Sequence, residues 1–478
     1  MVILAAAAAV LMVPVIWRRP VIGLYVLVGA AVMIEIFPLG FPDSLTDQLP
    51  FFLNLNNTAG LRGFSGSPAE VFMGVALLAW LTSASSGGWQ RLKEARIFRP
   101  YLAYIAVVGL AELHGLASGG DFNVSLWELR PQVYAFLIYV MAATLLRERR
   151  QFLVVAGIFV AGAAIKAAIG YNRYFFTLHQ DLGGAEAILA HEESYFLALL
   201  VIATVAACIW YWRPKLVVPM LLFLPVVFVV LVENQRRAAM LALWAGLAVV
   251  TGLAIWFEPR LRKRLIVISA VAVIVLGVFT ATYWNQQYGL AAQLVRPVHS
   301  ILGEPDQRDY SSNLYRENEN ANLIATYRTD VPLGIGFGLP MLVVYPMADI
   351  SQSYPFWQYI PHNSLLWVAM RMGLLGMAVF WALVGTSLIE AISLFRTRTD
   401  PFLRGFAAFA VAAIAAELIV GFGDLQLENY RNMIFFGAML GMIDAAGRIP
   451  ELVPAVLRAG LLSRTPAALP MGAAQPTK

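Results

Sequence analysis

Charged residues are scarce in this chain of 478 residues. Only 13% are Asp, Glu, Lys or Arg, about half the share of roughly 25% that is usual in globular proteins, while 60% are hydrophobic. A water-soluble fold could not hide that much apolar surface, and the same composition excludes a disordered chain. Since one membrane-spanning helix needs about 20 mostly apolar residues, the composition predicts a membrane protein.

Cysteine is almost absent, and so are the usual metal motifs. The lone Cys208 lies inside an apolar run, which excludes an intramolecular disulfide and a cysteine-based metal site. The chain has no Asp-x-Asp pair for a metal–nucleotide-sugar complex, and residues 191–195 (HEESY) lack the second histidine of a zinc helix. We therefore expect no metal and no cofactor.

Polar loops separate thirteen apolar segments. Basic clusters occupy every second loop, which places those loops in the cytoplasm by the positive-inside rule and leaves the amino terminus outside and the carboxyl terminus inside. The apolar segments are 2–16, 21–38, 68–82, 100–117, 131–146, 152–170, 194–212, 216–232, 238–257, 265–283, 372–395, 402–423 and 431–447.

This pattern predicts an all-α polytopic integral membrane protein with about 12–13 transmembrane helices. Residues 1–283 would form a bundle of ten spans, and residues 284–371 a large, partly helical periplasmic loop between the tenth and eleventh spans. Residues 372–447 would form the C-terminal helices, and residues 448–478 a cytoplasmic tail. A loop of that length is usually functional, and all five histidines fall on its side of the membrane, so we expect the active site there.

Two adjacent arginines, Arg236 and Arg237, interrupt the apolar pattern in a very short outer turn. A guanidinium group donates in a bidentate fork that suits a phosphate or diphosphate. The alternative is an interfacial pair that contacts lipid headgroups. Arg130, Arg316 and Arg328 also lie outside the cytoplasmic clusters and are further candidate ligands for an anion.

His362 directly precedes an apolar helix and follows an aromatic stretch that contains Trp357 and Tyr359. Imidazole has a reference pKa of about 6.5 and can accept a proton from a hydroxyl near neutral pH, and aromatic rings can stack on sugars. The alternative is a histidine at a helix entry whose ring is satisfied by the backbone, beside an ordinary interfacial aromatic belt. Chemistry alone does not separate the two.

Taken together, these elements resemble the bacterial O-antigen ligase and O-antigen polymerase superfamily. The matching motifs occur in the family's order between residues 236 and 376. They are Arg237–Leu241 (RAAML), Arg316 within Asn313–Glu317 (NLYRE), Pro332–Gly338 (PLGIGFG), and His362–Leu366 (HNSLL) with Gly373 and Gly376. The chain departs from the family in having Arg236 where a small residue is usual, and in having one span more than the twelve common among the ligases.

The resemblance implies a donor glycan on undecaprenyl diphosphate and its transfer to an acceptor sugar hydroxyl, on lipid A core or a growing glycan, at the periplasmic face of the bacterial inner membrane. The transfer would invert the anomeric centre and need no metal. The implied catalytic residues are His362, Arg237 and Arg316. The implied binding residues are Arg236, Arg130, Arg328, Asn363, Tyr359 and Trp357.

Three other functions fit parts of the pattern. Polymerisation of O-antigen or exopolysaccharide repeat units uses the same donor, as does transfer to protein side chains. A flippase or transporter of lipid-linked glycans would need a charged cavity deep in the membrane that opens to both sides. Most of the ionisable residues inside the predicted spans lie toward the outer side of the membrane, which argues against a transporter. The short basic clusters between apolar runs argue against a nucleic-acid partner.

Overall fold

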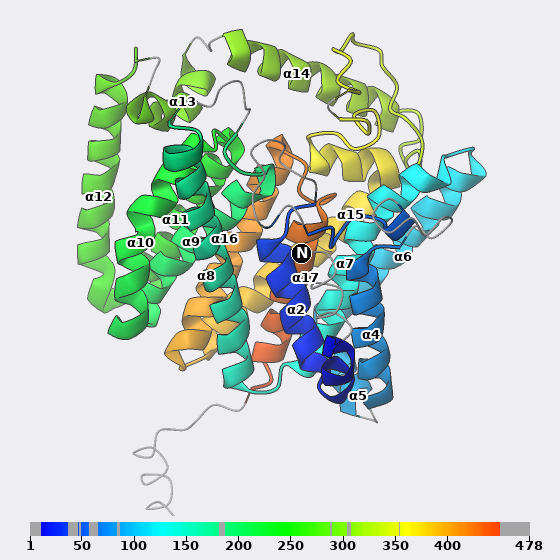
Figure 1. Ribbon diagram of the computed structural model, residues 1–478, viewed down its shortest axis with the longest axis horizontal. Helices are drawn as coiled ribbons and strands as arrows, with labels where there is room; N and C mark the ends of the chain where they lie inside the picture. The colour runs from blue at the N-terminus through cyan, green and yellow to red at the C-terminus, as the bar shows by residue number, and fades with distance from the viewer. Residues whose placement is uncertain are drawn as a thin grey trace, which may run out of the picture.

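The computed structural model describes residues 11–36, 46, 49–56, 66–83, 87–180, 187–286, 289–303, 307–352 and 354–449. Over these residues the chain is helical and contains no strand, which confirms the predicted all-α class (Figure 1). The helices are α2 (Pro20–Met33), α4 (Pro68–Ser83), α5 (Gly87–Glu94), α6 (Phe98–Ala117), α7 (Phe122–Leu145), α8 (Arg149–Asn172) with the π-helical turn η1 (Arg173–Thr177), α9 (His191–Trp210), α10 (Pro214–Glu233), α11 (Arg237–Phe257), α12 (Pro259–Thr282), α13 (Leu290–Leu302), α14 (Gln307–Tyr327), α15 (Ser364–Thr397), α16 (Pro401–Gly423) and α17 (Tyr430–Ala446).

The chain is a multi-pass membrane protein. Eight of the described helices are long and apolar enough to cross a membrane, or nine if α4 and α5 form one broken span. The count is lower than the predicted 12–13 because α2 has only 14 residues and α17 only 17, and because α7 carries Glu128 and Arg130. The predicted segment 2–16 lies largely outside the described residues.

Helix α17 lies at the centre of the bundle, and all of its residues are buried. It packs closely along α7 because Gly437 and Gly441, one turn apart, carry no side chain. A Cβ atom at Gly437 would lie 2.2 Å from the carbonyl oxygen of Ala135, and one at Gly441 would lie 2.5 Å from that of Tyr139. Small residues at this spacing let two membrane helices approach through their backbones. Helix α12, by contrast, has no buried residue and lies at the edge of the molecule (Figure 1).

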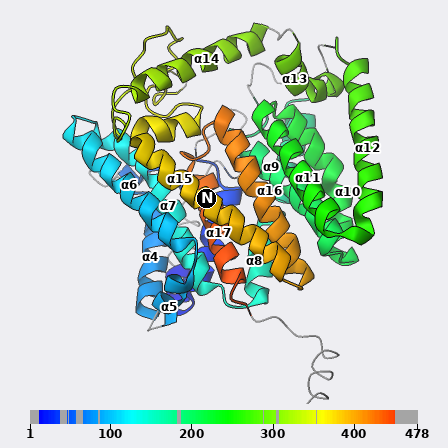
Figure 2. The ribbon, with the colours of Figure 1, turned by 180° about the vertical axis from the view of Figure 1, so that it is seen from behind.

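Side-chain caps define several helix starts. Asp121, Asn363, Asp400 and Asn429 each accept hydrogen bonds from backbone amides in the first turn of α7, α15, α16 and α17, which satisfies donors that a helix otherwise leaves unpaired. The caps before α15 and α17 lie at the end of the bundle that α13 and α14 cross (Figures 1 and 2). They fix the ends of the helices that carry the candidate site.

Helix α15 begins at Ser364 and not at residue 372, where the apolar pattern placed the start of a span. The helix is interrupted at Gly373, whose backbone (φ 60°, ψ −160°) is not helical. Residues 364–372 therefore form a first part that packs near α14, and the remainder forms the apolar span. The pattern identified the second part of the helix, and the division of the chain into domains remains a prediction.

Candidate active site on one face of α14

Helix α14 presents a row of polar residues to the ends of α11 and α15. Asp309, Asn313, Arg316, Glu319 and Asn320 are spaced three or four residues apart and so share one face of the helix. The first two contact the start of α11, and the last two contact the start of α15. The row therefore joins segments that lie more than 120 residues apart in the sequence.

His362 is held by Glu319. The ring Nδ1 of His362 lies 3.1 Å from Oε1 of Glu319, and the backbone amide of His362 donates to Oε2 at 3.0 Å. The carboxylate is 1% exposed and the imidazole 21%, and the ring of Tyr315 meets that of His362 edge-on, with centroids 5.8 Å apart. A carboxylate on Nδ1 favours the tautomer protonated there and leaves Nε2 able to accept a proton.

Arg237 begins α11 and reaches α14. Its Nη2 donates to Oδ1 of Asn313 at 3.0 Å, and its Nη1 lies 3.7 Å from Oδ1 of Asp309. Asp309 is buried and also accepts two hydrogen bonds from Arg296 of α13, at 2.6 and 2.9 Å. One carboxylate thus lies between two guanidinium groups at this end of α14.

The neighbouring Arg236 turns toward a second cluster. Its Nη2 contacts Nε2 of His191, at the first position of α9, and Nδ1 of the same ring lies 3.8 Å from Oδ2 of Asp424. Burial alone would raise the pKa of Asp424, but the nearby His191, His362 and Arg236 hold it well below its usual range. Asp424 is therefore ionised and ties the Arg236 cluster electrostatically to His362.

Glu428, four residues further on, has the opposite character. It is buried, accepts a hydrogen bond from Oγ of Ser364 at 2.6 Å, and its Oε1 has no hydrogen-bond partner among the described residues. Burial raises its pKa from 4.5 to about 8. The segment between α16 and α17 therefore places one ionised and one protonated carboxyl group beside the start of α15.

Arg316 lies between the two ends of the α14 row. It is half-buried, and its side chain makes no hydrogen bond or ion pair with another described residue. Asn313 and Glu319, its neighbours on the same face, are separated by about 9 Å along the helix axis. Arg316 is thus the cation between Arg237 and His362.

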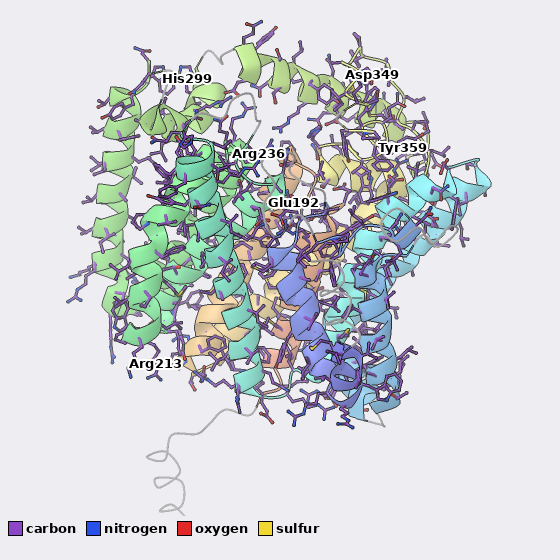
Figure 3. The ribbon with its side chains drawn as sticks, viewed as in Figure 1. Glu192, Arg213, Arg236, His299, Asp349 and Tyr359 are labelled. Atoms are coloured by element: carbon purple, nitrogen blue, oxygen red, sulfur yellow. The ribbon has the colours of Figure 1, made fainter. Side chains whose placement is uncertain are left out.

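The other predicted binding residues lie in several places. Arg328 is exposed beyond the end of α14, about 18 Å along the axis from Arg316. Arg130 is paired with Glu70 at 3.0 Å and is 10% exposed. Figure 3 shows Tyr359 and Arg236 at the same end of the molecule as α14.

The remaining two candidates lie close to His362 in the chain. Asn363 caps α15 and donates to Oδ1 of Asn320 at 3.1 Å, so it joins the α14 row. Trp357 is half-buried against the hydrophobic core. The structure thus brings Arg237, Arg316, His362 and Asn363 to one helix face, and leaves Arg328 and Arg130 away from it.

The glycine-rich segment 332–338 fills a gap between α6 and α15. Gly334, Gly336 and Gly338 all have positive φ, and a Cβ atom at Gly336 would lie 2.3 Å from the backbone nitrogen of Gly115. Arg371, fully buried, donates to the carbonyl oxygens of Gly336 and Leu339 and pairs with Glu128 at 2.6 Å. This segment and its arginine position the loop that leads to His362.

Sequence reasoning missed Glu319, Asp309 and Asp424, and it included His191 only as one of the five histidines on the outer side. The spacing of polar residues in 309–320 was the available signal for the first two, since it places them on the same helix face as Arg316. His191 and Asp424 come close to Arg236 only through the packing of α9 against α16, which no local sequence pattern predicts.

The fold and the site define a polytopic membrane protein with a cationic, histidine-bearing surface at one end of its bundle. Residues 226–381 match the family described as O-antigen ligase, so this part of the chain is similar to an O-antigen ligase domain. The matched stretch runs from the end of α10 into α15 and contains Arg236, Arg237, Arg316, Glu319 and His362. No curated protein matches the chain. The domain indicates glycan transfer of the O-antigen ligase or polymerase type.

Proposed function

We propose that the chain is an inner-membrane glycosyltransferase that moves an oligosaccharide or polysaccharide from undecaprenyl diphosphate to an acceptor sugar hydroxyl on the periplasmic side, with inversion and without a metal. The observation that carries the proposal is the shared face of α14. This face carries Asn313, which contacts Arg237, then Arg316, and then Glu319, whose carboxylate holds His362.

In the proposed reaction, Arg237 and Arg316 bind the diphosphate and neutralise the charge that grows on it as it leaves, since guanidinium groups bind phosphate in a bidentate manner. Nε2 of His362 takes the proton of the acceptor hydroxyl. The hydroxyl oxygen forms a bond to the anomeric carbon while the bond from that carbon to the diphosphate oxygen breaks. Attack from the opposite side inverts the anomeric centre, and the diphosphate leaves without a general acid.

Glu319 is a positioning residue in this scheme. Its carboxylate fixes the ring of His362 and stabilises the imidazolium that forms when Nε2 is protonated, the relation that a buried carboxylate has to a histidine base in general. Asn363 binds Asn320 and caps α15, so it holds the peptide that carries His362 against α14.

His362→Ala tests the base directly. We expect the purified variant to lose glycan transfer by about 10²- to 10⁴-fold while it still expresses and binds the lipid-linked donor. His299→Ala is the matched control, because His299 lies in α13 at the same end and its ring contacts that of Trp284. Wild-type turnover in His362→Ala would exclude His362 as the base.

The acceptor separates ligation from polymerisation. In cells that lack the chain, bare lipid A core on the surface supports a ligase. Single repeats that are still attached to the core support the alternative, a polymerase of O-antigen or exopolysaccharide units. The description of the matched family favours the ligase.

The orientation of the chain has its own test. Tyr310 is 58% exposed on α14, and the one native cysteine, Cys208, can be replaced by alanine. In that background we expect Tyr310→Cys to react with a membrane-impermeant thiol reagent added to intact spheroplasts. Labelling only after lysis would place α14 in the cytoplasm and contradict a periplasmic site.

A further inference from the structure

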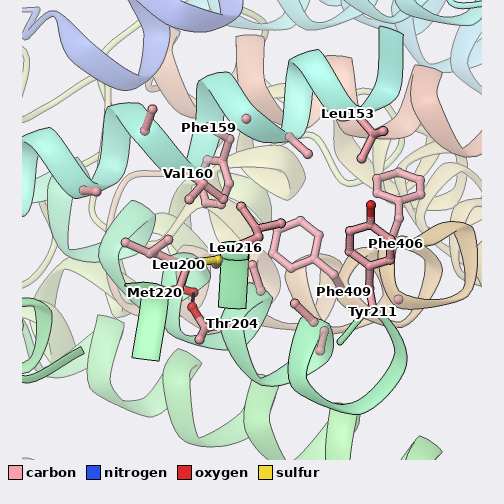
Figure 4. A pocket seen from close by; sticks show the side chains of 18 of the residues that line it. Leu153, Phe159, Val160, Leu200, Thr204, Tyr211, Leu216, Met220, Phe406 and Phe409 are labelled. Atoms are coloured by element: carbon pink, nitrogen blue, oxygen red, sulfur yellow. Dashed lines mark hydrogen bonds between the residues drawn. The ribbon is translucent and has the colours of Figure 1, made fainter. Parts of the chain in front are cut away.

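A large apolar groove lies between α8, α9, α10, α16 and α17. Its volume is about 570 Å³, within the range of small-molecule sites, and Figure 4 shows its lining of aliphatic and aromatic side chains. The hydroxyl of Thr204 is satisfied by the carbonyl oxygen of Leu200 at 2.7 Å, and the other polar groups of the lining, on Tyr211 and Lys215, lie at or just before the start of α10. The groove is therefore apolar over most of its length.

The sequence explains why this space is empty. Where α8 and α10 meet near the candidate site, Gly170 packs against Val230. Toward the other end, small residues such as Gly157, Ala161 and Ala203 line the groove. A Cβ atom at Gly157 would meet nothing within 4 Å. Small side chains on α8 and α9 thus leave a channel under the face of α10 that runs from Leu216 to Val227.

The mouth of the groove is positively charged. Lys215 lines the groove there, and Arg213, two residues earlier, is exposed with its guanidinium 5.7 Å from the ring centroid of Tyr211. Neither makes an ion pair with another described residue. Arg149 at the same end is instead paired with Asp400 at 2.9 Å. Figure 3 shows Arg213 at the end of the molecule opposite to Arg236. Two unpaired cations above an apolar channel are complementary to an anionic headgroup on a hydrocarbon chain.

We propose that this groove binds one anionic phospholipid, with an acyl chain in the channel and the headgroup phosphate on Arg213 and Lys215. The channel spans about 17 Å along α10, close to the thickness of one leaflet, which is about half of a 30 Å hydrocarbon core. The site lies at the opposite end of the bundle from Arg237, so the lipid is a separate ligand from the glycan donor and the proposal does not depend on the proposed function.

Filling the groove is the first test. The full chain, purified in mild detergent, is titrated with phosphatidylglycerol, and bound lipid is counted by native mass spectrometry. Gly157→Leu places a side chain in the channel without a backbone clash, and we expect it to lose one tightly bound lipid. Gly252→Leu in α11, where a Cβ atom also meets nothing within 4 Å, is the matched control and is expected to keep it. Equal lipid retention by the two variants would overturn the proposal.

Neutralising the mouth is the second test. Arg213→Gln with Lys215→Gln is expected to weaken phosphatidylglycerol binding by roughly 30-fold, since each cation near a lipid surface contributes about fivefold. It should leave the binding of phosphatidylcholine unchanged. Arg260→Gln with Lys263→Gln, a basic pair at the start of α12, is the control and should have little effect. If wild type binds phosphatidylcholine as tightly, or if undecaprenyl phosphate displaces the lipid in a manner sensitive to Gly157→Leu, the groove does not select an anionic phospholipid.

Discussion

Arg371 and Arg316 lie in the same domain, but their surroundings differ. Arg371 is fully buried, donates to three backbone carbonyl oxygens and pairs with Glu128. Arg316 is half-buried, and its side chain makes no hydrogen bond or ion pair with another described residue. A guanidinium group has five N–H donors, so an arginine whose donors are used inside the protein serves the fold, while one with donors left over can bind an anion.

The same contrast separates two regions of the molecule. Around Arg371, the glycine-rich segment, α6, α7 and α15 form a region in which the central charges, Arg371 and Glu128, are both fully buried and pair with each other. Along α14, Arg237 and Arg296 share the carboxylate of Asp309, and His362 remains partly accessible beside Glu319. The first region fixes the backbone, and the second is the surface on which we place the chemistry.

Arg371→Met should have the largest effect and should act on stability. It leaves the carboxylate of Glu128 buried without its cation, which costs about 3–5 kcal/mol, and it frees the carbonyl oxygens of the glycine-rich segment. We expect a much lower midpoint of thermal unfolding in detergent and poor yield of folded protein. Arg316→Met is the matched change in the other region, and its unfolding midpoint should stay within the range of ordinary surface substitutions. Similar midpoints for the two variants would remove the distinction between the regions.

Glu319→Gln comes next and should act on turnover. A glutamine can still contact the ring of His362, but it can donate to Nδ1 and does not stabilise an imidazolium, so the wrong tautomer is favoured. We expect a loss of about 100-fold in kcat with little change in the KM for the donor. Glu319→Asp should recover part of the rate. An equal rise in KM for both variants would mean that Glu319 supports only the local fold.

Much of the fold could be predicted from the sequence because apolar runs and basic clusters are local properties. The helices α8 to α12 and α16 coincide with predicted segments to within a few residues. The start of α15 could not be predicted in this way. The composition of residues 364–372 fits either a loop or a helix, and the helix there depends on the cap at Asn363 and the break at Gly373.

The candidate site was predicted in part for a similar reason. Arg237, Arg316 and His362 stand out as charged or titratable residues at apolar boundaries, and the structure brings them to one surface. Their partners Glu319 and Asp309 lie in a polar helix where charges are common, so only their contacts distinguish them. Arg328 and Arg130 carried the same signal as Arg316, and only the packing of α4, α7 and α14 separates the three.

Arg237→Ala compared with Arg328→Ala sharpens the contrast among the arginines. Loss of a charge-assisted hydrogen bond to a phosphate is worth about 1.5–2 kcal/mol, so we expect KM for the diphosphate donor to rise about 10- to 30-fold in Arg237→Ala. Arg328 is exposed beyond the end of α14, and its variant should stay within about twofold of wild type. Steady-state transfer at varied donor concentration measures both. Equal losses would place the diphosphate elsewhere on the α14 surface.

Glu428→Gln should have the smallest effect at acidic pH, and the effect should grow as the pH rises. Burial raises the pKa of Glu428 from 4.5 to about 8, so the folded chain keeps this proton while the unfolded chain loses it. The stability that the protonated carboxyl contributes is therefore complete below pH 4.5 and is lost as the pH rises through 8. Glutamine cannot ionise, so Glu428→Gln should unfold like wild type at pH 5 and should be more stable at pH 8.5 by several kcal/mol, because each unit of pKa difference is worth about 1.4 kcal/mol. Thermal unfolding in detergent at the two pH values measures this, with the exposed Glu317→Gln as control. Parallel curves for wild type and Glu428→Gln would show that Glu428 is already ionised in the folded chain and would place a further negative charge beside the start of α15.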